Sequence, residues 1–159
     1  MSIRIEIVAV AVVRPLQRAV LRPHLPPEAA TYAEDLEPST VHLAAYDAEG
    51  QVAGVATFFP QPYPGPFVED GPAPEVAATA WRLRGMATDP ARRGEGFGAA
   101  VLRRGMAEAA TRGGRLLWCN ARTPAVPFYA AHGLRTVGAE FAVATIGSHY
   151  RMVAPLRAA

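Results

Sequence analysis

The stretch that decides the interpretation of this 159-residue chain is Arg92-Arg93-Gly94-Glu95-Gly96-Phe97-Gly98, and an amphipathic helix is expected directly after it. The three glycines at alternate positions have no Cβ, so neighbouring backbone N–H groups can point into one concavity. The start of a helix adds unpaired N–H groups and the positive end of a helix dipole. Together these features predict a seat for a phosphate or pyrophosphate group, with the two arginines adding positive charge at its edge.

The composition is that of a globular protein. Half of the residues are apolar and 19% are charged, so we expect a single domain with a full hydrophobic core over residues 1–159. The net charge is +2 and no basic stripe is interleaved with aromatic residues, which gives no reason to expect a nucleic-acid partner. All sixteen basic residues are arginine. The absence of lysine excludes Schiff-base chemistry on a lysine amine and a Walker-type phosphate loop.

Cysteine usage and hydropathy bear on location. The one cysteine, Cys119, rules out an intrachain disulfide and is compatible with a reducing compartment. The apolar run from Ile7 to Val13 is too short to span a membrane and lacks the layout of a signal peptide, so we expect a buried strand there. We therefore expect a cytoplasmic protein that does not contact membranes. His24, His42 and His132 have no metal-ligand spacing with Cys119, and we expect no metal.

The residue pattern predicts an alternation of strands and helices in the second half of the chain but not in the first. Strands are expected over residues 3–12, 40–46, 52–59, 76–88, 115–120, 134–143 and 149–155. Helices are expected over residues 15–21, 28–36, 96–112 and 124–131. The proline-rich stretch 60–74 is expected to be a loop, either a rim or lid over a site or an exposed connection. This order predicts a mixed α/β fold.

Two types of phosphate-binding loop fit the glycines. Gly94, Gly96 and Ala99 satisfy the dinucleotide-binding pattern G-x-G-x-x-A, but residues 88–93 separate them from the preceding strand. The acidic residue that this motif requires about twenty residues later is missing from residues 116–120. A dinucleotide-binding domain, which would show affinity for NAD, is therefore the weakest of the three functions that the sequence suggests; the other two follow from the second type of loop.

The second type is that of the GCN5-related N-acetyltransferase family, which the chain resembles at two motifs in the right order and spacing. The strand-loop-helix over residues 86–102 contains the family signature Arg/Gln-x-x-Gly-x-Gly/Ala at Arg93, Gly96 and Gly98. About thirty residues later, residues 128–134 resemble the family's Phe/Leu-Tyr-x-x-x-Gly-Phe, with Leu134 in place of the usual phenylalanine.

The resemblance covers roughly residues 40–156 and extends to a bacterial subgroup of small acetyltransferases. It implies the GNAT acyl-CoA N-acyltransferase fold, a mostly antiparallel sheet of about six or seven strands flanked by about four helices. It also implies acetyl-CoA as the cofactor, CoA as the product, and a pantetheine arm between the splayed strands 76–88 and 115–120. Gly85, inside the first of these strands, independently suggests a bulge or a close backbone approach. The cofactor-binding residues expected on this basis are Met86, Ala87, Thr88, Arg92, Arg93, Gly94, Glu95, Gly96, Phe97, Gly98, Asn120, Arg122 and Tyr129.

Acetyl transfer to an amine requires three things of a site. The amine must lose a proton to a base, and the departing thiolate is helped by a general acid. The developing oxyanion needs a donor, and the resemblance assigns this to a backbone N–H near residues 86–88.

Two side chains are candidates for the proton transfers. Tyr129 matches the family's tyrosine and is the candidate acid, the alternative being a packed aromatic with a hydrogen-bonded hydroxyl. His149 is the candidate base because histidine titrates near neutral pH. A purely structural histidine, the carboxylates Glu140 and Glu69, and a chain of waters are the alternatives.

Several further residues carry two interpretations. Arg82 and Arg84 alternate along one strand and share a face, where they favour an acceptor with a carboxylate or phosphate or else form ion pairs at the sheet surface. Arg122 stands where many relatives carry asparagine, and Asn120 lies two residues earlier. Cys119 is interpreted as a small buried hydrophobe rather than a nucleophile.

The sequence thus predicts an acetyl-CoA-dependent N-acetyltransferase that acts by direct transfer in a ternary complex. The expected acceptor is the primary amine of a small molecule or an amino-acid-like compound, with protein N-termini also open. The alternative is a noncatalytic acyl-CoA-binding or sensor module on the same fold. Both a monomer and a homodimer are compatible with the sequence.

Overall fold

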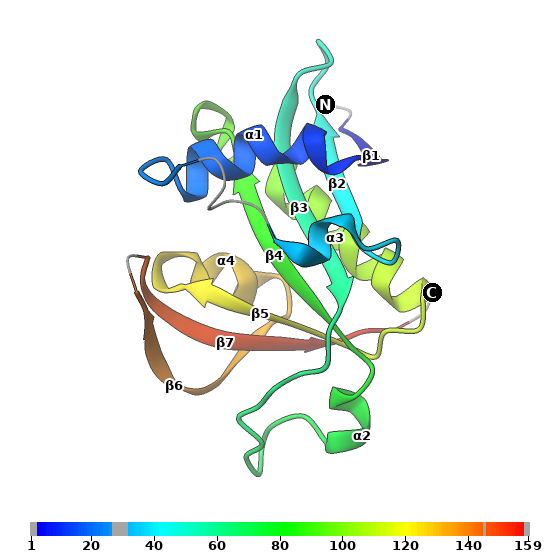
Figure 1. Cartoon of the computed structure of the whole chain (residues 1–159), viewed down its shortest axis with the longest axis vertical. Helices are drawn as coiled ribbons and strands as arrows, with labels where there is room; N and C mark the ends of the chain where they lie inside the picture. Colours follow the sequence, from blue (N-terminus) through cyan, green and yellow to red (C-terminus); the bar gives the residue numbers. More distant parts are fainter. Residues whose placement is uncertain (1–2, 27–31, 145, 158–159) are drawn as a thin grey trace. The chain divides into compact units, whose positions relative to one another are not determined.

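The structure is a computed structural model that describes residues 3–26, 32–144 and 146–157. Within them the chain forms a mixed α/β fold with one seven-stranded sheet of order β1-β2-β3-β4-β5-β7-β6 (Figure 1). The strands are β1 (Arg4–Val8), β2 (Val41–Tyr46), β3 (Val52–Pro60), β4 (Ala80–Thr88), β5 (Leu116–Arg122), β6 (Arg135–Val143) and β7 (Gly147–Pro155). The helices are α1 (Val10–Leu21), α2 (Pro74–Ala77), α3 (Phe97–Thr111) and α4 (Val126–Ala131), with short 3₁₀ helices η2 (Ala33–Leu36), η3 (Pro90–Arg92) and η4 (Thr123–Ala125).

Most strand pairs are antiparallel, as the resemblance implied. The pairs β1–β2, β2–β3, β5–β7 and β6–β7 run antiparallel, whereas β4 and β5 run parallel. The parallel ladder covers three residue pairs, from Ala80–Leu116 to Arg82–Trp118, although both strands are longer than that. The predicted fold class is confirmed.

The chain divides into two compact units. The first unit comprises Met1–Phe59 and Leu83–Glu108, and the second comprises Pro60–Arg82 and Ala109–Ala159. Strand β4 therefore begins in the second unit and ends in the first, and helix α3 begins in the first and ends in the second. Among the described residues, no helix is long and apolar enough to cross a membrane.

In the first unit, α1 and α3 cover opposite faces of the β2–β3 pair (Figure 1). Successive side chains of a strand point to opposite faces, so Val55 joins Val13 of α1 in one apolar cluster while Phe58 meets α3. The α3 helix approaches β3 closely at two glycines. A Cβ added to Gly54 would lie 3.2 Å from the Cβ of Phe97, and one added to Gly105 would lie 1.9 Å from the ring of Phe58.

In the second unit, the proline-rich segment after β3 is docked on the sheet. The indole Nε1 of Trp118 donates to the carbonyl of Gln61 at 2.9 Å, and the backbone N–H of Tyr63 donates to the carbonyl of Ala77 at 2.9 Å. Tyr63 is 2% exposed and packs edge-on against Trp118, with ring centroids 6.2 Å apart. The start of this loop is therefore a fixed part of the second unit, while Phe67 is 56% exposed.

The predicted boundaries were wrong at the N-terminal end of the chain. The first strand stops at Val8, and α1 begins at Val10 rather than at Pro15, which lies inside the helix. A run of valines satisfies strand propensity, but Val13, Leu16 and Val20 also recur at helical spacing and pack together in the core cluster. Packing of this apolar stripe outweighs both the β-branched residues and the hydrogen bond that an interior proline removes.

Other boundaries shift by a few residues. Residues 76 and 77 belong to α2, so the strand expected from residue 76 begins at Ala80. Strand β5 runs on to Arg122, and β7 includes Gly147 and Ser148, which had been expected in a loop. Of the helix expected over residues 28–36, positions 28–31 lie outside the described residues and the rest contains η2.

Candidate active site

The glycine-rich loop of the first unit has a backbone conformation that favours glycine at two positions. Gly94 and Gly96 have φ angles of +83° and +93°, a region that side chains with a Cβ rarely adopt. Nothing lies within 4 Å of a Cβ built on Gly94, so the loop is open on that side. Asp89 starts the loop: its carboxylate accepts from the N–H of Ala91 at 3.0 Å, and its own N–H donates to the carbonyl of Ala53 at 2.9 Å.

Helix α3 begins at Phe97, one residue later than expected. Its first turn contains no acidic side chain, and the carboxylate of Glu95, two residues before the helix, is held by Arg92. The side chain of Phe97 is 1% exposed and anchors the helix start in the core. Among the predicted cofactor-binding residues, Phe97 can therefore contribute its backbone N–H but not its ring.

Arg92 and Glu95, both predicted at the cofactor loop, bind each other, and Arg92 also binds a residue that sequence reasoning missed. Arg92 donates to Glu95 Oε2 at 3.0 Å and to the carboxylate of Asp47 on the β2–β3 hairpin. Backbone N–H donation from Gln51 and the Arg92 guanidinium hold the pKa of Asp47 below its usual value. These contacts neutralise Arg92, which leaves Arg93, an exposed side chain, as the cation at the edge of the loop.

Strand β4 makes a close contact at Gly85, with a side chain rather than with another backbone. Gly85 has a φ of +70°, and a Cβ placed there would lie 2.3 Å from Gln17 Nε2. That amide donates to the Gly85 carbonyl at 3.1 Å and to Thr57 Oγ1 at 2.9 Å. Gln17 thus holds β4 immediately before Met86, Ala87 and Thr88, three predicted cofactor contacts.

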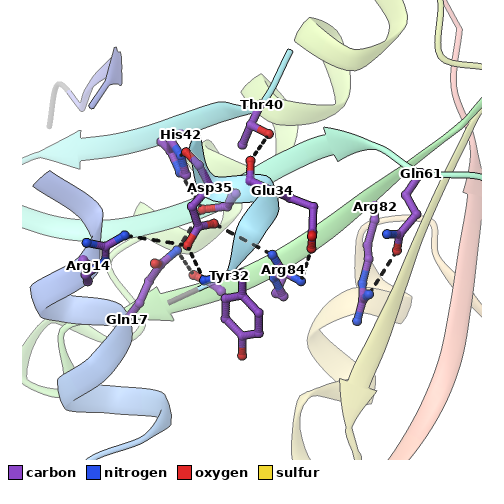
Figure 2. A network of polar contacts seen from close by, with 12 residues as sticks. Arg14, Gln17, Tyr32, Glu34, Asp35, Thr40, His42, Gln61, Arg82 and Arg84 are labelled. Carbon is purple, nitrogen blue, oxygen red and sulfur yellow. Dashed lines mark hydrogen bonds and ion pairs between the residues drawn. The ribbon is translucent and has the colours of Figure 1, made fainter. Parts of the chain in front are cut away.

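The Gln17 contact continues into a buried histidine (Figure 2). His42 is 5% exposed, with Nε2 3.0 Å from the Asp35 carbonyl and Nδ1 2.8 Å from Thr57 Oγ1. Because a carbonyl only accepts, the neutral ring carries its proton on Nε2, and the Thr57 hydroxyl donates to Nδ1. No local sequence pattern predicts this series of hydrogen bonds, because Gln17, Thr57, His42 and Asp35 come from four separate elements, α1, β3, β2 and η2.

Arg84 forms ion pairs, which is the second of the two interpretations given for it in the sequence analysis. We call Arg14, Tyr32, Glu34, Asp35 and Arg84 the Arg84 cluster (Figure 2). The Arg84 guanidinium lies 3.0 Å from Glu34 Oε1 and 3.8 Å from Asp35 Oδ1, and its Cζ is 3.6 Å from the centroid of the Tyr32 ring. Arg14 adds a longer contact to Asp35 at 3.9 Å. With two carboxylates beside it and 15% side-chain exposure, Arg84 is not placed to receive an anionic acceptor.

Arg82, the other arginine of β4, has different surroundings in the second unit. Its Nη1 donates to Gln61 Oε1 at 3.0 Å (Figure 2). Its Cζ lies 4.7 Å from the centroid of the Trp118 ring. Residues 82 and 84 are thus held by different chemistry although strand alternation gives them the same face of β4.

Tyr129 lies on α4 and is 7% exposed. In the part of the chain that the structure describes, its hydroxyl has no hydrogen-bond partner, while its ring meets Phe128 edge-on at 5.3 Å. Burial raises the pKa of Tyr129 well above that of a free phenol, so the hydroxyl keeps its proton. Burial also raises the pKa of Cys119 to about 12, which makes this thiol a poor nucleophile.

The remaining predicted residues lie on one face of the β5–β7 ladder. Arg122 pairs with His149, and Asn120 pairs with Arg151, whose Nε donates to Asn120 Oδ1 at 3.0 Å. His149 Nδ1 lies 2.9 Å from the Gly147 carbonyl and therefore carries the proton of the neutral ring. Its Nε2 keeps a lone pair that no described residue uses, as a general base requires.

The alternative carboxylate bases have other contacts or surroundings. Glu140 Oε1 accepts from the hydroxyl of Ser148. Glu69 is exposed on the loop that follows β3. The His149 ring, in contrast, is 5% exposed and stacks on Phe141 with ring centroids 5.8 Å apart.

Comparison with known proteins identifies the family. The model of the acetyltransferase (GNAT) family matches residues 9–134, which include segments of both units. The chain belongs to the GNAT family. It is 32% identical over 142 residues to the uncharacterized N-acetyltransferase YitI of Bacillus subtilis (strain 168), with 89% of each protein covered.

Solved GNAT structures share the fold. A GCN5-related N-acetyltransferase from Kribbella flavida matches with a TM-score of 0.69 and 24% identity, covering 97% of this chain and 98% of its own. An aminoglycoside 6'-N-acetyltransferase, solved in complex with coenzyme A, matches with a TM-score of 0.67 and 17% identity over 96% and 97% of the two chains. The protein is a GNAT acetyltransferase, and the predicted family is confirmed.

The predicted site residues of this GNAT protein fall into two groups. Residues 86–98 belong to the first unit, where the loop, the start of α3 and the Gly85 contact follow one another. Asn120, Arg122, Tyr129 and His149 belong to the second unit. Within that unit Asn120, Arg122 and His149 share one face, while the amide oxygen of Asn120 is occupied by Arg151.

Proposed function

We propose that this acetyltransferase transfers the acetyl group of acetyl-CoA directly to the primary amine of a small-molecule or amino-acid-like acceptor. The observation that carries the proposal is the open loop with left-handed Gly94 and Gly96 ahead of an acid-free helix start. Such a loop suits a pyrophosphate, which the coenzyme supplies together with its thioester. The proposal treats residues 1–159 as one catalytic domain.

The cofactor contacts that we propose are mostly backbone groups. The N–H groups of residues 93–98 would hold the pyrophosphate, with the exposed Arg93 beside them. Arg92 and Glu95 would act indirectly, because their mutual contact and the contact to Asp47 fix the loop. Backbone N–H groups of residues 86–88 would stabilise the oxyanion, and Gln17 would hold this part of β4 through Gly85.

His149 is the proposed base. Its Nε2 would take a proton from the acceptor ammonium, and the neutral nitrogen would then attack the acetyl carbonyl carbon. The Nδ1–H bond to Gly147 orients the ring and stays in place when Nε2 is protonated. After each turnover the base would return its proton to solvent.

Tyr129 is the proposed acid. As the carbon–sulfur bond breaks, the hydroxyl would donate a hydrogen bond and then its proton to the sulfur of CoA, and the strongly basic phenolate left behind would regain a proton from solvent. Its raised pKa keeps the phenol protonated through the working pH range, and its open hydroxyl is available for this contact.

A cytoplasmic location and the choice between monomer and homodimer remain predictions from the sequence.

Release of the CoA thiol in the presence of acetyl-CoA and a panel of primary amines tests this function. We expect acceptor-dependent release that Tyr129→Phe lowers by about 10²-fold or more, the range of general acid catalysis. The control variant is Tyr46→Phe, which changes a tyrosine at the end of β2. CoA binding without acetyl transfer to any amine would favour the noncatalytic module, and full activity of Tyr129→Phe would refute the assignment of the acid.

A further inference from the structure

The guanidinium of Arg151, on β7, carries a charge that the second unit does not compensate. Its Nε donates to Asn120 Oδ1 and its Nη1 to the carbonyl of Gly65, and both acceptors are neutral. The sequence segments of this unit hold seven of the sixteen arginines but four of the fourteen acids, namely Glu69, Asp70, Glu75 and Glu140. Within the described residues, none of these four carboxylates forms an ion pair with Arg151.

Aromatic rings, rather than carboxylates, surround this charge. We call Arg82, Trp118, Asn120, Phe141 and Arg151 the Arg151 cluster. The Cζ of Arg151 lies 5.2 Å from the centroid of the Trp118 ring and 5.6 Å from that of Phe141. The Cζ of Arg82 lies 4.7 Å from the centroid of the same Trp118 ring, so both guanidiniums contact one indole. Burial lowers the pKa of Arg151, an effect that a bound anion would oppose.

The Arg151 cluster adjoins the proposed base. His149 lies two residues before Arg151 on β7, so both side chains are on the same face of that strand. The Phe141 ring stacks on His149 and also meets the Arg151 guanidinium. The Nε2 lone pair of His149, which can accept a proton, and the charge of Arg151, which can bind an anion, therefore both lie beside the Phe141 ring.

We propose that Arg151, supported by Arg82, binds a carboxylate of the acceptor, so that the acceptor is an amino acid or another amine with a carboxylate a few bonds away. A planar guanidinium matches a carboxylate in shape and donates two parallel hydrogen bonds to it. A carboxylate is also a stronger acceptor than the amide and peptide oxygens that Arg151 now contacts. This inference rests on the proposed function, because it takes His149 as the group that receives the proton of the amine.

The test compares amino acids with their carboxamides, which lack the negative charge that Arg151 would bind. We would measure kcat/KM by release of the CoA thiol for leucine, phenylalanine and methionine and for the amide of each. Arg151→Gln should lower kcat/KM for the acids by about 10- to 100-fold, the effect of removing a charged hydrogen-bond partner. The same variant should leave the amides within about twofold, and the exposed Arg103→Gln should affect neither.

Comparing each substrate between variants cancels the different basicity of the amines. Equal losses for acid and amide in Arg151→Gln would overturn the inference while leaving the proposed function intact. So would a wild-type enzyme that acetylates amines without using any acid of the panel. Failure of acetyl-CoA to bind and of every amine to react would instead overturn the proposed function.

A measurement on the wild-type protein covers the case in which Arg151→Gln does not fold. N-acetyl amino acids are the products that the inference predicts, and they should inhibit CoA release at least about tenfold more strongly than their N-acetyl amides. Equal inhibition by the two would overturn the inference. Stronger inhibition by phosphorylated amines than by the N-acetyl amino acids would do so as well, because it would assign the cluster to a phosphate.

Discussion

The Arg84 cluster and the Arg151 cluster each contain a partly buried guanidinium, but the groups that surround its charge differ. Arg84 sits between Glu34 and Asp35, so its charge is balanced inside the first unit. Arg151 sits among aromatic rings and neutral oxygens, so its charge is not. Charge balance therefore distinguishes Arg84, which holds the fold, from Arg151, which we propose binds the acceptor.

The largest expected effect is on stability. Arg84→Met leaves the carboxylate of Asp35, 5% exposed, without its shorter ion-pair contact, and we expect a loss of about 3 kcal/mol in the free energy of unfolding. Arg151→Met leaves no buried carboxylate behind and should cost about 1 kcal/mol, from lost hydrogen bonds and ring contacts. Urea unfolding of both variants, with Arg103→Met as the surface control, measures the difference. Equal costs would remove the distinction between the clusters.

The next effect concerns selectivity. Arg82 shares the Trp118 ring with Arg151, so Arg82→Gln should weaken the field that favours a carboxylate. We expect the ratio of kcat/KM for an amino acid to that for its amide to fall by about three- to tenfold, less than for Arg151→Gln, because Arg82 acts in support. Arg22→Gln, whose Cζ lies 5.4 Å from the Tyr32 ring in the first unit, is the matched control and should leave the ratio unchanged. An unchanged ratio in Arg82→Gln would confine the proposed recognition to Arg151.

A smaller effect is expected on the pH dependence of stability. The pKa of Asp47 is lowered in the folded protein, so its contribution to stability is complete above the ordinary value of 3.8 and is lost as the pH falls through the lower folded value. Asp47→Asn should therefore be less stable than the wild type at pH 6, and the difference should shrink below about pH 4. Urea unfolding from pH 3 to pH 7 measures this, with the exposed Asp70→Asn as the control. A difference that stays constant with pH would contradict the lowered pKa of Asp47.

The smallest effect is an expected absence of reaction. With its pKa raised to about 12, the Cys119 thiol in the second unit should remain neutral up to pH 9. Iodoacetamide should modify it in the native protein at least about 10²-fold more slowly than in urea, since the thiolate is the reactive form. Mass spectrometry of the timed reaction gives both rates. Rapid native modification would show that this part of the second unit opens readily.

From the sequence we could predict those features of the candidate site that depend on residue type and spacing within a short segment. Left-handed backbone at Gly94 and Gly96 requires glycine, and α3 shows a 3.6-residue apolar stripe, so both could be found from residue types and spacing. The family motifs then supplied Tyr129. The start of α1 was missed because a valine run fits a strand and a helix equally well, and only packing decides.

The contacts that decide the role of each arginine could not be predicted. Arg84 meets Glu34 across 50 positions of sequence, and Gln17 meets Gly85 across 68. No short window contains both members of such a pair. The two interpretations of Arg84 therefore stayed open until the fold showed two carboxylates beside its guanidinium.

The most direct test of the account is the ligand that the glycine loop binds. Thermal unfolding would be followed with acetyl-CoA, CoA, NAD and ATP at matched concentrations, since a ligand at about 100 times its Kd adds about 2.7 kcal/mol to the free energy of unfolding. We predict stabilisation by acetyl-CoA and by CoA, with no comparable shift from NAD. Stabilisation by NAD instead, or by none of the four, would contradict the proposed seat for the coenzyme and the function built on it.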